Sequence, residues 1–375
     1  MAINKKRHSR IIKLGGNGHV KEVLLGGKEP IVIQTMWKDR LLASDLKGAG
    51  EKSIRERLEV LEKLGCGALR FAVPDEEAAS LLGHLSKLVS LPLIADIHFD
   101  YKIALRCLDF PIAKIRINPG NIGGAGKVRA VLSKAKDRGV PLRIGINAGS
   151  LPRDLSCAVE EAKISRAKAM VKAALREIEL FNENQFTDFL VSMKASSIAD
   201  TIKANQIFAR QSDVPLHIGV TEAGPLIAGV VRSTAALMVL LKEGIGETIR
   251  VSLSDTMENE VIAGREILAA VTGIKAKKDS KNNGITIVSC PRCGRNTFDT
   301  HAFTEKWQTR LYSMDKKAII AIMGCSVNGP GESAHADLGI TGLGNKVVIF
   351  RNGKVTRTVG IAEADDAFRE EIEKL

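Results

Sequence analysis

The chain has 375 residues, of which 45% are hydrophobic and 26% are charged. This length allows one large domain with a small one, or two to three average domains, and the composition excludes global disorder. No apolar run approaches the length of a membrane span, and no apolar segment follows the basic start MAINKKRHSR. We therefore expect a cytoplasmic protein that has no secretory signal and no contact with a membrane.

The net charge of +12 fits an anionic partner, which includes nucleic acid, acidic proteins and polyanionic substrates. Aromatic residues make up only 4% of the chain, and no long basic tract is interleaved with them. That composition argues against base stacking on single-stranded nucleic acid.

The chain also contains six cysteines. A disulfide framework is not expected in a cytoplasmic chain of this size, so clustered cysteines indicate a metal or redox site.

Short β-rich apolar runs alternate with helix-like segments over the first 270 residues or so. Helical segments such as SIRERLEVLEKLG and VRAVLSKAKDRG end in Gly, a common residue at helix C-termini. Eight such runs predict an α/β fold of the (β/α)8 TIM-barrel type, and a doubly wound open sheet is the competing interpretation. The runs are PIVIQTM from Pro30, ALRFAVP from Ala68, PLIADIH from Pro92, AKIRINP from Ala113, PLRIGIN from Pro141, TDFLVSMKA from Thr187, PLHIGVTE from Pro215 and TIRVSLS from Thr248.

The composition turns polar and Lys-rich in VTGIKAKKDSKNNG, and a new strand-like run begins at ITIVSC. We therefore predict a barrel over residues 1–272, a Lys-rich linker over residues 273–284 and a small α+β domain over residues 285–375. Within the last domain KAIIAIMGC and KVVIFRNGKV look like strands, and an acidic helix closes the chain.

Four of the predicted barrel strands carry an Arg between β-forming residues: Arg70, Arg116, Arg143 and Arg250. Side chains alternate across a strand, so an inward Arg143 brings Gly145 and Asn147 inward as well. By the same rule Arg116 brings Asn118, and Arg250 brings Ser252 and Ser254. Several guanidinium groups in one lumen need balancing anions, and a bound diphosphate would match their geometry. The alternative is internal pairing with Asp96, Glu222 and Asp255, or an outward orientation.

Polar residues at the C-terminal ends of barrel strands form the active site in this fold. Here the third run ends in Asp96 and His98, Lys194 lies near the end of the sixth, and Glu222 ends the seventh. The Gly-rich loop NPGNIGG after Arg116 could bring backbone N–H groups to a phosphate.

The last domain contains a metal-binding pattern, SCPRCGR with Cys290 and Cys293, followed by MGCSVNGPGE with Cys325 and Glu332. Three thiolates leave a fourth position for a weaker ligand, and Glu332 is the nearest candidate for an iron–sulfur centre. A zinc site that uses His301 or His335 as the fourth ligand stays open, although no second C-x-x-C follows. For Cys66, Cys107 and Cys157 we expect burial as small hydrophobic residues.

The motifs resemble those of one enzyme family, 4-hydroxy-3-methylbut-2-enyl diphosphate synthase of the non-mevalonate isoprenoid pathway. The resemblance runs from about Val20 to the C-terminal helix in the order of the family. It is carried by ADIHFDYKIAL, KIRINPGNIG, RIGINAGSL, GVTEAG, SCPRCGR, and MGCSVNGPGE with HADLGITG after it.

This resemblance implies a (β/α)8 barrel joined to a reductase-like cluster domain, in the shorter two-domain bacterial form. It implies reductive opening of 2-C-methyl-D-erythritol 2,4-cyclodiphosphate to 4-hydroxy-3-methylbut-2-enyl diphosphate by two electrons. A 4Fe-4S cluster would carry the electrons, flavodoxin or ferredoxin would supply them, and a head-to-tail homodimer would pair each cluster with the barrel of the other chain.

The resemblance also assigns roles to residues wherever the motifs match. It implies that Cys290, Cys293, Cys325 and Glu332 hold the cluster and that Asn328 lies beside it. Glu222 would be the acid of the reaction. The implied substrate-binding residues are Arg70, Arg116, Asn118, Arg143, Asn147, Lys194, Arg250 and Ser252.

One segment departs from the family pattern. After the first strand the family continues QSMT with further Thr and an Asp, whereas this chain has QTMWKDRLLASDLKGAG, with Trp37 and Lys38 where Thr would be expected. Either the diphosphate contacts are rearranged, or the substrate differs, or the loop has drifted without consequence.

Two other functions would account for parts of this sequence. One is a pterin-binding transferase barrel of the dihydropteroate-synthase type with a zinc-binding tail. The other is a nucleic-acid-binding module with a zinc ribbon, motivated by the net charge. Neither explains Glu332 together with the NGPG sequence.

Overall fold

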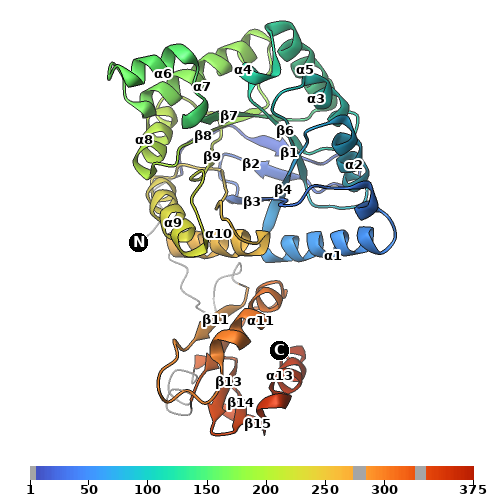
Figure 1. Cartoon of the computed structure of the whole chain (residues 1–375), viewed down its shortest axis with the longest axis vertical. Helices are drawn as coiled ribbons and strands as arrows, with labels where there is room; N and C mark the ends of the chain where they lie inside the picture. The colour runs from blue at the N-terminus through green and yellow to red at the C-terminus, as the bar shows by residue number, and fades with distance from the viewer. Residues whose placement is uncertain (1–5, 273–283, 326–334) are drawn as a thin grey trace. The chain divides into compact units, whose positions relative to one another are not determined.

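The computed structural model describes residues 6–272, 284–325 and 335–375. The chain divides into two compact units, Met1–Gly273 and Ile274–Leu375 (Figure 1). All of the predicted Lys-rich linker except Gly284 lies outside the described residues. Among the helices that the structure describes, none has the length and apolarity needed to cross a membrane.

The first unit is built on a parallel sheet whose strand order is β8-β7-β6-β5-β4-β3-β10-β9. A parallel bridge between Val191 and Leu216 brings the two ends of the sheet together, so the sheet is a nearly closed barrel. This arrangement confirms the predicted TIM barrel over the open sheet, and all eight predicted runs contain a strand. The strands are β3 (Val32–Met36), β4 (Cys66–Ala72), β5 (Leu93–Asp96), β6 (Lys114–Ile117), β7 (Leu142–Asn147), β8 (Phe189–Lys194), β9 (His217–Ile218) and β10 (Thr248–Ile249).

Helices surround the sheet in Figure 1. Helix α1 ends at Gly65 and α5 ends at Gly139, both with the positive φ that favours glycine at a helix C-terminus. The helices are α1 (Ala49–Leu64), α2 (Glu76–Ser86), α3 (Tyr101–Cys107), α4 (Pro119–Ile122), α5 (Ala125–Arg138), α6 (Arg153–Glu160), α7 (Arg166–Glu183), α8 (Ile198–Ala209), α9 (Leu226–Lys242) and α10 (Met257–Thr272), with 3-10 turns η1 (Ala43–Leu46) and η2 (Ala148–Ser150).

A short hairpin that sequence patterns did not predict precedes the barrel. Strands β1 (Ile12–Leu14) and β2 (Val23–Leu25) pair in antiparallel fashion. Their buried side chains, among them Leu14 and Leu25, pack against Ile94 and Leu190 of the barrel strands. Ile94 and Leu190 belong to the apolar layer of the lumen that lies nearer the N-terminal ends of the strands. The hairpin therefore covers the end of the barrel opposite the strand C-termini.

The second unit is an α+β domain with a five-stranded mixed sheet in the order β11-β12-β13-β14-β15. The predicted strand KVVIFRNGKV is in fact β14, a tight turn at Asn352 and Gly353, and the start of β15, because both turn residues adopt positive φ. The elements are β11 (Thr286–Ser289), α11 (Thr300–Tyr312), β12 (Ile319–Met323), β13 (Leu338–Leu343), β14 (Lys346–Arg351), β15 (Lys354–Gly360), η4 (Ile361–Glu363) and α13 (Ala364–Glu373).

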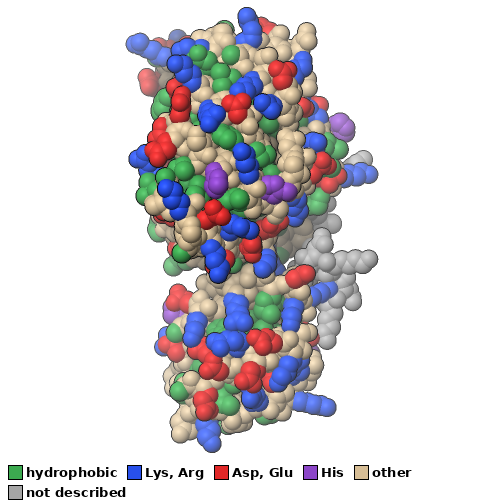
Figure 2. Space-filling view, turned by 90° about the vertical axis from the view of Figure 1, so that its right-hand side faces the viewer, with side chains coloured by type: hydrophobic (Ala, Val, Ile, Leu, Met, Phe, Trp, Pro, Cys, Tyr) green, Lys and Arg blue, Asp and Glu red, His purple; other side chains and the backbone are tan. Residues whose placement is uncertain are grey.

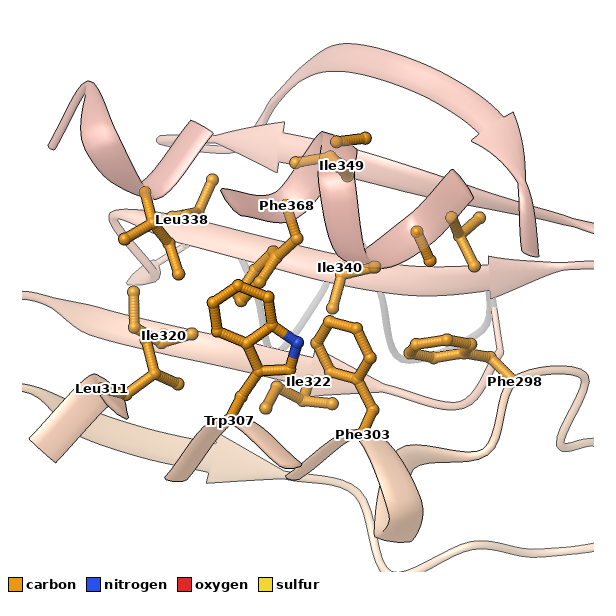
Figure 3. Close-up of a cluster of buried hydrophobic side chains, with 14 of the residues drawn as sticks. Phe298, Phe303, Trp307, Leu311, Ile320, Ile322, Leu338, Ile340, Ile349 and Phe368 are labelled. Atoms are coloured by element: carbon orange, nitrogen blue, oxygen red, sulfur yellow. The ribbon is translucent and has the colours of Figure 1, made fainter. Parts of the chain in front are cut away.

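The core of this domain lies between the sheet and its two helices (Figure 3). Phe368 of α13 packs edge-on against Phe303 and Trp307 of α11, with each pair of ring centroids 5.1 Å apart. Ile320, Ile322 and Ile340 of the sheet complete the cluster. The domain therefore has its own hydrophobic core, which fixes the ends of β11 and β12 where the cysteine motif begins.

Candidate functional site

The upper lumen of the barrel is polar and basic. Residues paired across neighbouring strands point to the same face, and Asp96, Arg116 and Arg143 are such partners on β5, β6 and β7. All three side chains are buried. The predicted alternation along each strand therefore places these residues in the lumen above the apolar layer that contains Ile94 and Leu190.

Asp96 is the carboxylate at the centre of one half of this site. It lies 3.1 Å from Arg116 Nη1 and 3.5 Å from Arg70 Nε, and Arg116 also approaches His98 Nε2 at 2.6 Å. Burial alone would raise the pKa of Asp96. The charges of Arg70 and Arg116 and a hydrogen bond from His98 outweigh that effect and hold the pKa well below its usual range. Asp96 is therefore ionised and neutralises part of the arginine charge.

Glu260 of α10 is the carboxylate of the other half, and it is fully buried. Arg250 binds both of its oxygens at 3.2 Å, as a planar fork. Lys38 and the Thr35 hydroxyl also donate to Glu260, and the Leu253 amide donates at 3.0 Å. Burial would raise the pKa of Glu260, but the Arg250 charge and these hydrogen bonds keep it lowered.

Two lysines and a histidine lie in the same lumen with little solvent. Lys194 Nζ is 3.0 Å from His217 Nε2, whose ring also approaches the Thr248 hydroxyl at 3.4 Å. Burial, followed by the charge of Arg143, lowers the pKa of Lys194 and of Lys114 well below the ordinary value. Burial and the charge of Lys194 lower the pKa of His217 well below its ordinary value.

Gly145 on β7 leaves room for an arginine. A Cβ at this position would lie 2.7 Å from Arg116 Nε and 2.8 Å from Arg116 Nη2. Any side chain there would displace the guanidinium, so the glycine is required by the packing of Arg116. Asn118 and Asn147 follow at the ends of β6 and β7, where Asn118 is buried and Asn147 is partly exposed. Ser252 is also partly exposed, two residues beyond Arg250.

Glu222 differs from its sequence-based placement. Strand β9 ends at Ile218, so Glu222 lies four residues further on, in the loop that precedes α9, and not at the end of a strand. Gly219 follows the strand directly, and a Cβ there would come within 2.4 Å of the Arg250 carbonyl oxygen. The Glu222 side chain is exposed and its backbone has φ 51°, a strained conformation for a residue other than glycine.

The basic residues of the described lumen exceed its carboxylates. Arg143 is paired to Ser192 at 3.2 Å, while its Nε and the Lys114 ammonium have no hydrogen-bond partner among the described residues. Asp96 and Glu260 face the basic side chains of Arg70, Lys114, Arg116, Arg143, Lys194 and Arg250. Crowded cations in a medium of low dielectric constant gain free energy from a bound anion. The site is therefore suited to a polyanion.

Sequence patterns missed Glu260, Lys114 and His217. The predicted internal partners of the arginines were Asp96, Glu222 and Asp255. Asp96 does pair with Arg70 and Arg116, but Arg250 binds Glu260. Glu260 lies on the same helical face as the buried Met257 and Val261, and an acid on an apolar face is the signal that would have identified it.

The cysteine motif lies at one edge of the sheet in the second unit. Cys290 follows β11, and its amide donates to the Ile322 carbonyl of β12 at 3.0 Å, two residues before Gly324. A Cβ at Gly324 would meet Cys290 Sγ at 3.4 Å and would collide with Asn296 Oδ1. The sulfur of Cys290 therefore lies against the backbone that immediately precedes Cys325.

The three cysteines differ in exposure: Cys325 is buried, Cys290 is partly exposed and Cys293 is exposed. In the described residues they do not converge tightly enough to form a metal-binding group, and the same holds for His301 and His335. Glu332 and Asn328 lie outside the described residues. Thiol donors at one strand edge, with backbone amides beside them, fit an iron–sulfur centre chemically. Thiol donors also suit zinc. Of the other cysteines, Cys66 and Cys107 are buried as predicted, whereas Cys157 on α6 is exposed, contrary to the prediction, because it lies on the outer side of that helix.

Surface charge is mixed on the face shown in Figure 2, where Lys and Arg side chains alternate with Asp and Glu over each unit. Several of the exposed cations have acidic neighbours, such as Arg176 with Asp154 and Arg357 with Glu370. The face shown in Figure 2 therefore carries no continuous basic stripe of the kind that follows a nucleic-acid backbone.

Comparison with family models gives two adjacent matches. Residues 17–265 match the GcpE TIM-barrel domain, and residues 286–374 match the GcpE protein C-terminal domain. Among solved structures, 3-dehydroquinate dehydratase from Geobacillus kaustophilus is 12% identical with a TM-score of 0.47, and covers 72% of this chain and 99% of its own. Dihydropteroate synthase from Xanthomonas albilineans is 14% identical with a TM-score of 0.41, and covers 70% and 98%.

Curated relatives are similar over the whole chain, and each is named 4-hydroxy-3-methylbut-2-en-1-yl diphosphate synthase (flavodoxin). The relative from Treponema denticola is 49% identical and covers 100% of both chains. That from Treponema pallidum is 48% identical over 98% of this chain and 92% of its own, and that from Thermodesulfovibrio yellowstonii is 43% identical over 99% of each. On both the domain matches and these identities, the chain belongs to the GcpE family.

Proposed function

We propose that this protein is an oxidoreductase that converts 2-C-methyl-D-erythritol 2,4-cyclodiphosphate to (E)-4-hydroxy-3-methylbut-2-enyl diphosphate. The carrying observation is the excess of buried cations over carboxylates in the barrel lumen, which suits a diphosphate. The relatives bear the name of the enzyme that forms this product. The rival pterin-binding transferase has no comparable support from the family to which the chain belongs.

The barrel residues would bind and orient the cyclic diphosphate. The guanidinium groups would bind the phosphate oxygens, since the planar fork of donors matches their geometry. The side-chain amides of Asn118 and Asn147 and the hydroxyl of Ser252 would orient the carbon skeleton. We assign this role to Arg70, Arg116, Asn118, Arg143, Asn147, Lys194, Arg250 and Ser252. Burial of Arg116, Asn118, Arg143 and Lys194 supports the assignment, because a site that excludes water strengthens each charge–charge contact.

A 4Fe-4S cluster would be held by Cys290, Cys293, Cys325 and Glu332, with Asn328 beside it. Such a cluster supplies two electrons one at a time and a Lewis-acidic iron. The close packing of Cys290 Sγ on the backbone next to Cys325 supports this ligand set. Zinc would not supply electrons, and the reaction that we propose requires them.

Glu222 would supply the proton of the reaction. Two electrons break a C–O bond to the diphosphate and open the ring, and the electron pair left on that carbon forms the C=C bond as the hydroxyl of the neighbouring carbon takes up a proton and leaves as water. An exposed carboxyl in the loop after β9 can exchange protons with solvent between turnovers. The positive φ of Glu222 supports a functional role, since backbone strain is concentrated at such sites.

Flavodoxin is the electron donor that we propose, with ferredoxin as the alternative, because the relatives carry flavodoxin in their names. An acidic donor would be attracted by the net charge of +12. We further propose a cytoplasmic head-to-tail homodimer in which each active site takes its barrel from one chain and its cluster from the other.

Anaerobic turnover tests the whole proposal. Reconstituted protein with reduced flavodoxin, or with a chemical reductant, should consume the cyclodiphosphate and release one linear diphosphate per two electrons. A brown protein that absorbs near 400 nm is expected before substrate is added. A colourless zinc protein that leaves the cyclodiphosphate intact would overturn the assignment.

The proposed carboxylate ligand has its own test. Glu332→Ala should retain part of the cluster, because three thiolates remain, but should lose most activity. Iron content and the visible absorbance report the cluster, and turnover reports the activity. Normal turnover in this variant would remove Glu332 from the site.

A further inference from the structure

The segment after β3 has a defined structure at the mouth of the barrel. The Trp37 amide donates to the Arg70 carbonyl at 2.8 Å, and the Trp37 side chain is only 8% exposed. Its ring stacks on Phe71, with centroids 5.4 Å apart and planes 16° apart. The Arg57 guanidinium lies 5.2 Å from the Trp37 ring centroid. This packing is specific, which argues against an unconstrained loop.

Arg57 joins this segment to the first turn of α10. Its Nε donates to Glu258 at 3.0 Å, and its Nη1 lies 3.7 Å from Asp39. Arg57 thus contacts both Trp37 and Asp39. Lys38 lies between these two residues in the sequence and is directed towards Glu260 in the same turn of α10. Lys38 Nζ also donates to the Leu253 carbonyl at 2.9 Å. The backbone is therefore fixed in the position from which Lys38 reaches the buried carboxylate.

The charges at Glu260 do not cancel. Glu260 alone with Arg250 would be a neutral pair and would add little attraction for an anion. Lys38 donates to the same carboxylate, so the three groups together carry one net positive charge. The Lys38 side chain is 28% exposed, whereas that of Arg250 is 12% exposed and that of Glu260 is fully buried. The surplus charge therefore lies between the lumen and solvent.

We propose that Lys38 is a positioning residue of the diphosphate site: it shares Glu260 with Arg250 and so leaves Arg250 with positive charge for the substrate. This inference rests on the proposed function, and it assigns a role to the Trp37–Lys38 segment. Lys38 should affect substrate affinity and not the chemical step, because it acts through Arg250 and Glu260.

The test measures binding of inorganic pyrophosphate to the cluster-loaded protein by anaerobic calorimetry, together with KM and kcat for the cyclodiphosphate. Lys38→Met should weaken pyrophosphate binding by about tenfold, which is less than the effect of a charge in direct contact with the anion near a protein surface, because Lys38 acts through Arg250 and Glu260. KM should rise by a similar factor while kcat is retained. The loss should shrink at high ionic strength, because Lys38 is partly exposed.

Three further variants separate charge from packing. Lys38→Gln keeps a donor for Glu260 without the charge and should behave like Lys38→Met, whereas Lys38→Arg should restore binding to within about threefold. Lys52→Met removes an equal charge from an exposed site on α1, where Lys52 pairs only weakly with Glu56 at 3.9 Å, and should bind like the wild type.

The outcomes distinguish this inference from the proposed function. If the wild type binds no pyrophosphate and leaves the cyclodiphosphate unchanged, the proposed function is wrong. If the wild type is active but Lys38→Met and Lys38→Gln bind pyrophosphate with the wild-type affinity, the proposed role of Lys38 is wrong. The proposed function of the site is then unaffected. Failure of Lys38→Arg to restore binding would likewise overturn the inference, since it would show that shape and not charge is required.

Discussion

Arg143 and Arg250 are both arginines of the lumen, but Arg143 is buried, Arg250 is partly exposed, and their surroundings differ. Arg143 contacts Ser192 and is surrounded by other cations, and burial followed by the charge of Arg70 lowers its pKa. Arg250 has a bidentate carboxylate partner in Glu260. At the scale of single residues, the surroundings of Arg143 are suited to an anion, whereas Arg250 also contributes to the protein's own stability.

This contrast predicts different effects of two alanine substitutions. Arg143→Ala and Arg250→Ala should each weaken substrate binding by about 1.5–3 kcal/mol, the range for a charge-assisted hydrogen bond. In substrate-free protein only Arg250→Ala should lower the free energy of unfolding strongly, because it leaves Glu260 buried with fewer partners. Calorimetric binding and urea unfolding measure the two effects. Unchanged substrate affinity in both variants would mean that the arginines serve only the fold.

The second prediction at this scale concerns acid stability. The pKa of Glu260 is lowered in the folded protein, so its stabilising contribution is complete above the unfolded value of about 4.3 and is lost as pH falls through the folded pKa. Glu260→Gln should therefore cost about 3 kcal/mol at pH 7, the cost of breaking a buried ion pair. The difference from wild type should shrink below pH ~4.

Tryptophan fluorescence can follow that titration in the barrel alone. The chain has two Trp residues, Trp37 in the first unit and Trp307 in the second. In a Trp307→Phe background the remaining signal reports unfolding around Trp37. A Glu260→Gln penalty that does not change between pH 7 and strongly acid conditions would contradict the ionised state of Glu260.

At the scale of elements, the hairpin of β1 and β2 closes the lower end of the barrel, and its stability is directly testable. Leu14→Ala removes a side chain that is 1% exposed and packed on the barrel strands, and should cost about 2–5 kcal/mol. Ile11→Ala, at a side chain that is 55% exposed, should cost less than about 0.5 kcal/mol. Urea unfolding compares them. Equal penalties would show that the hairpin does not seal the barrel.

Periodicity predicted the barrel because each of its strands is a short apolar run between helices. It did not predict the hairpin, because strands of three residues are too short to show alternation. The turn that divides β14 from β15 was also missed, although the Asn352–Gly353 pair is a strong hairpin signal. Long, regular elements were therefore predictable, and those that depend on turn geometry or on tertiary packing were not.

The candidate site divides in a similar way. Alternation along a strand predicted that Asn118 shares the face of Arg116 and that Gly145 and Asn147 share the face of Arg143, since that follows from local backbone geometry. Glu260 comes from a helix, and no pattern within a strand connects it with Arg250. Its position follows from how α10 packs on β3, a long-range contact that single-sequence patterns do not encode.

At the scale of the whole molecule, the proposed substrate site and the proposed cluster ligands lie in different compact units. Arg143 belongs to the first unit and Cys325 to the second. The head-to-tail homodimer that we propose would complete each active site from two chains. Complementation between a variant without the cluster and a variant with an impaired barrel tests this arrangement, at a substrate concentration too low for Arg143→Ala alone to show turnover.

Cys325→Ser should abolish the cluster and leave the barrel intact, whereas Arg143→Ala should impair the barrel and leave the cluster intact. When the two are co-expressed, half of the dimers are mixed if subunits combine at random, and each mixed dimer has one complete site of two. Activity should therefore recover to about a quarter of the wild-type value. Affinity tags of two kinds allow the mixed dimers to be isolated and assayed for cyclodiphosphate turnover.

A double variant supplies the matched control. A chain that carries both Cys325→Ser and Arg143→Ala, co-expressed with Cys325→Ser alone, forms mixed dimers in which neither site has a cluster, and these should be inactive. Mixed dimers of the two single variants that are purified in this way and still show no turnover would mean that each site is contained within one chain. In that case the cluster domain must close over its own barrel, and the head-to-tail arrangement is wrong for this protein.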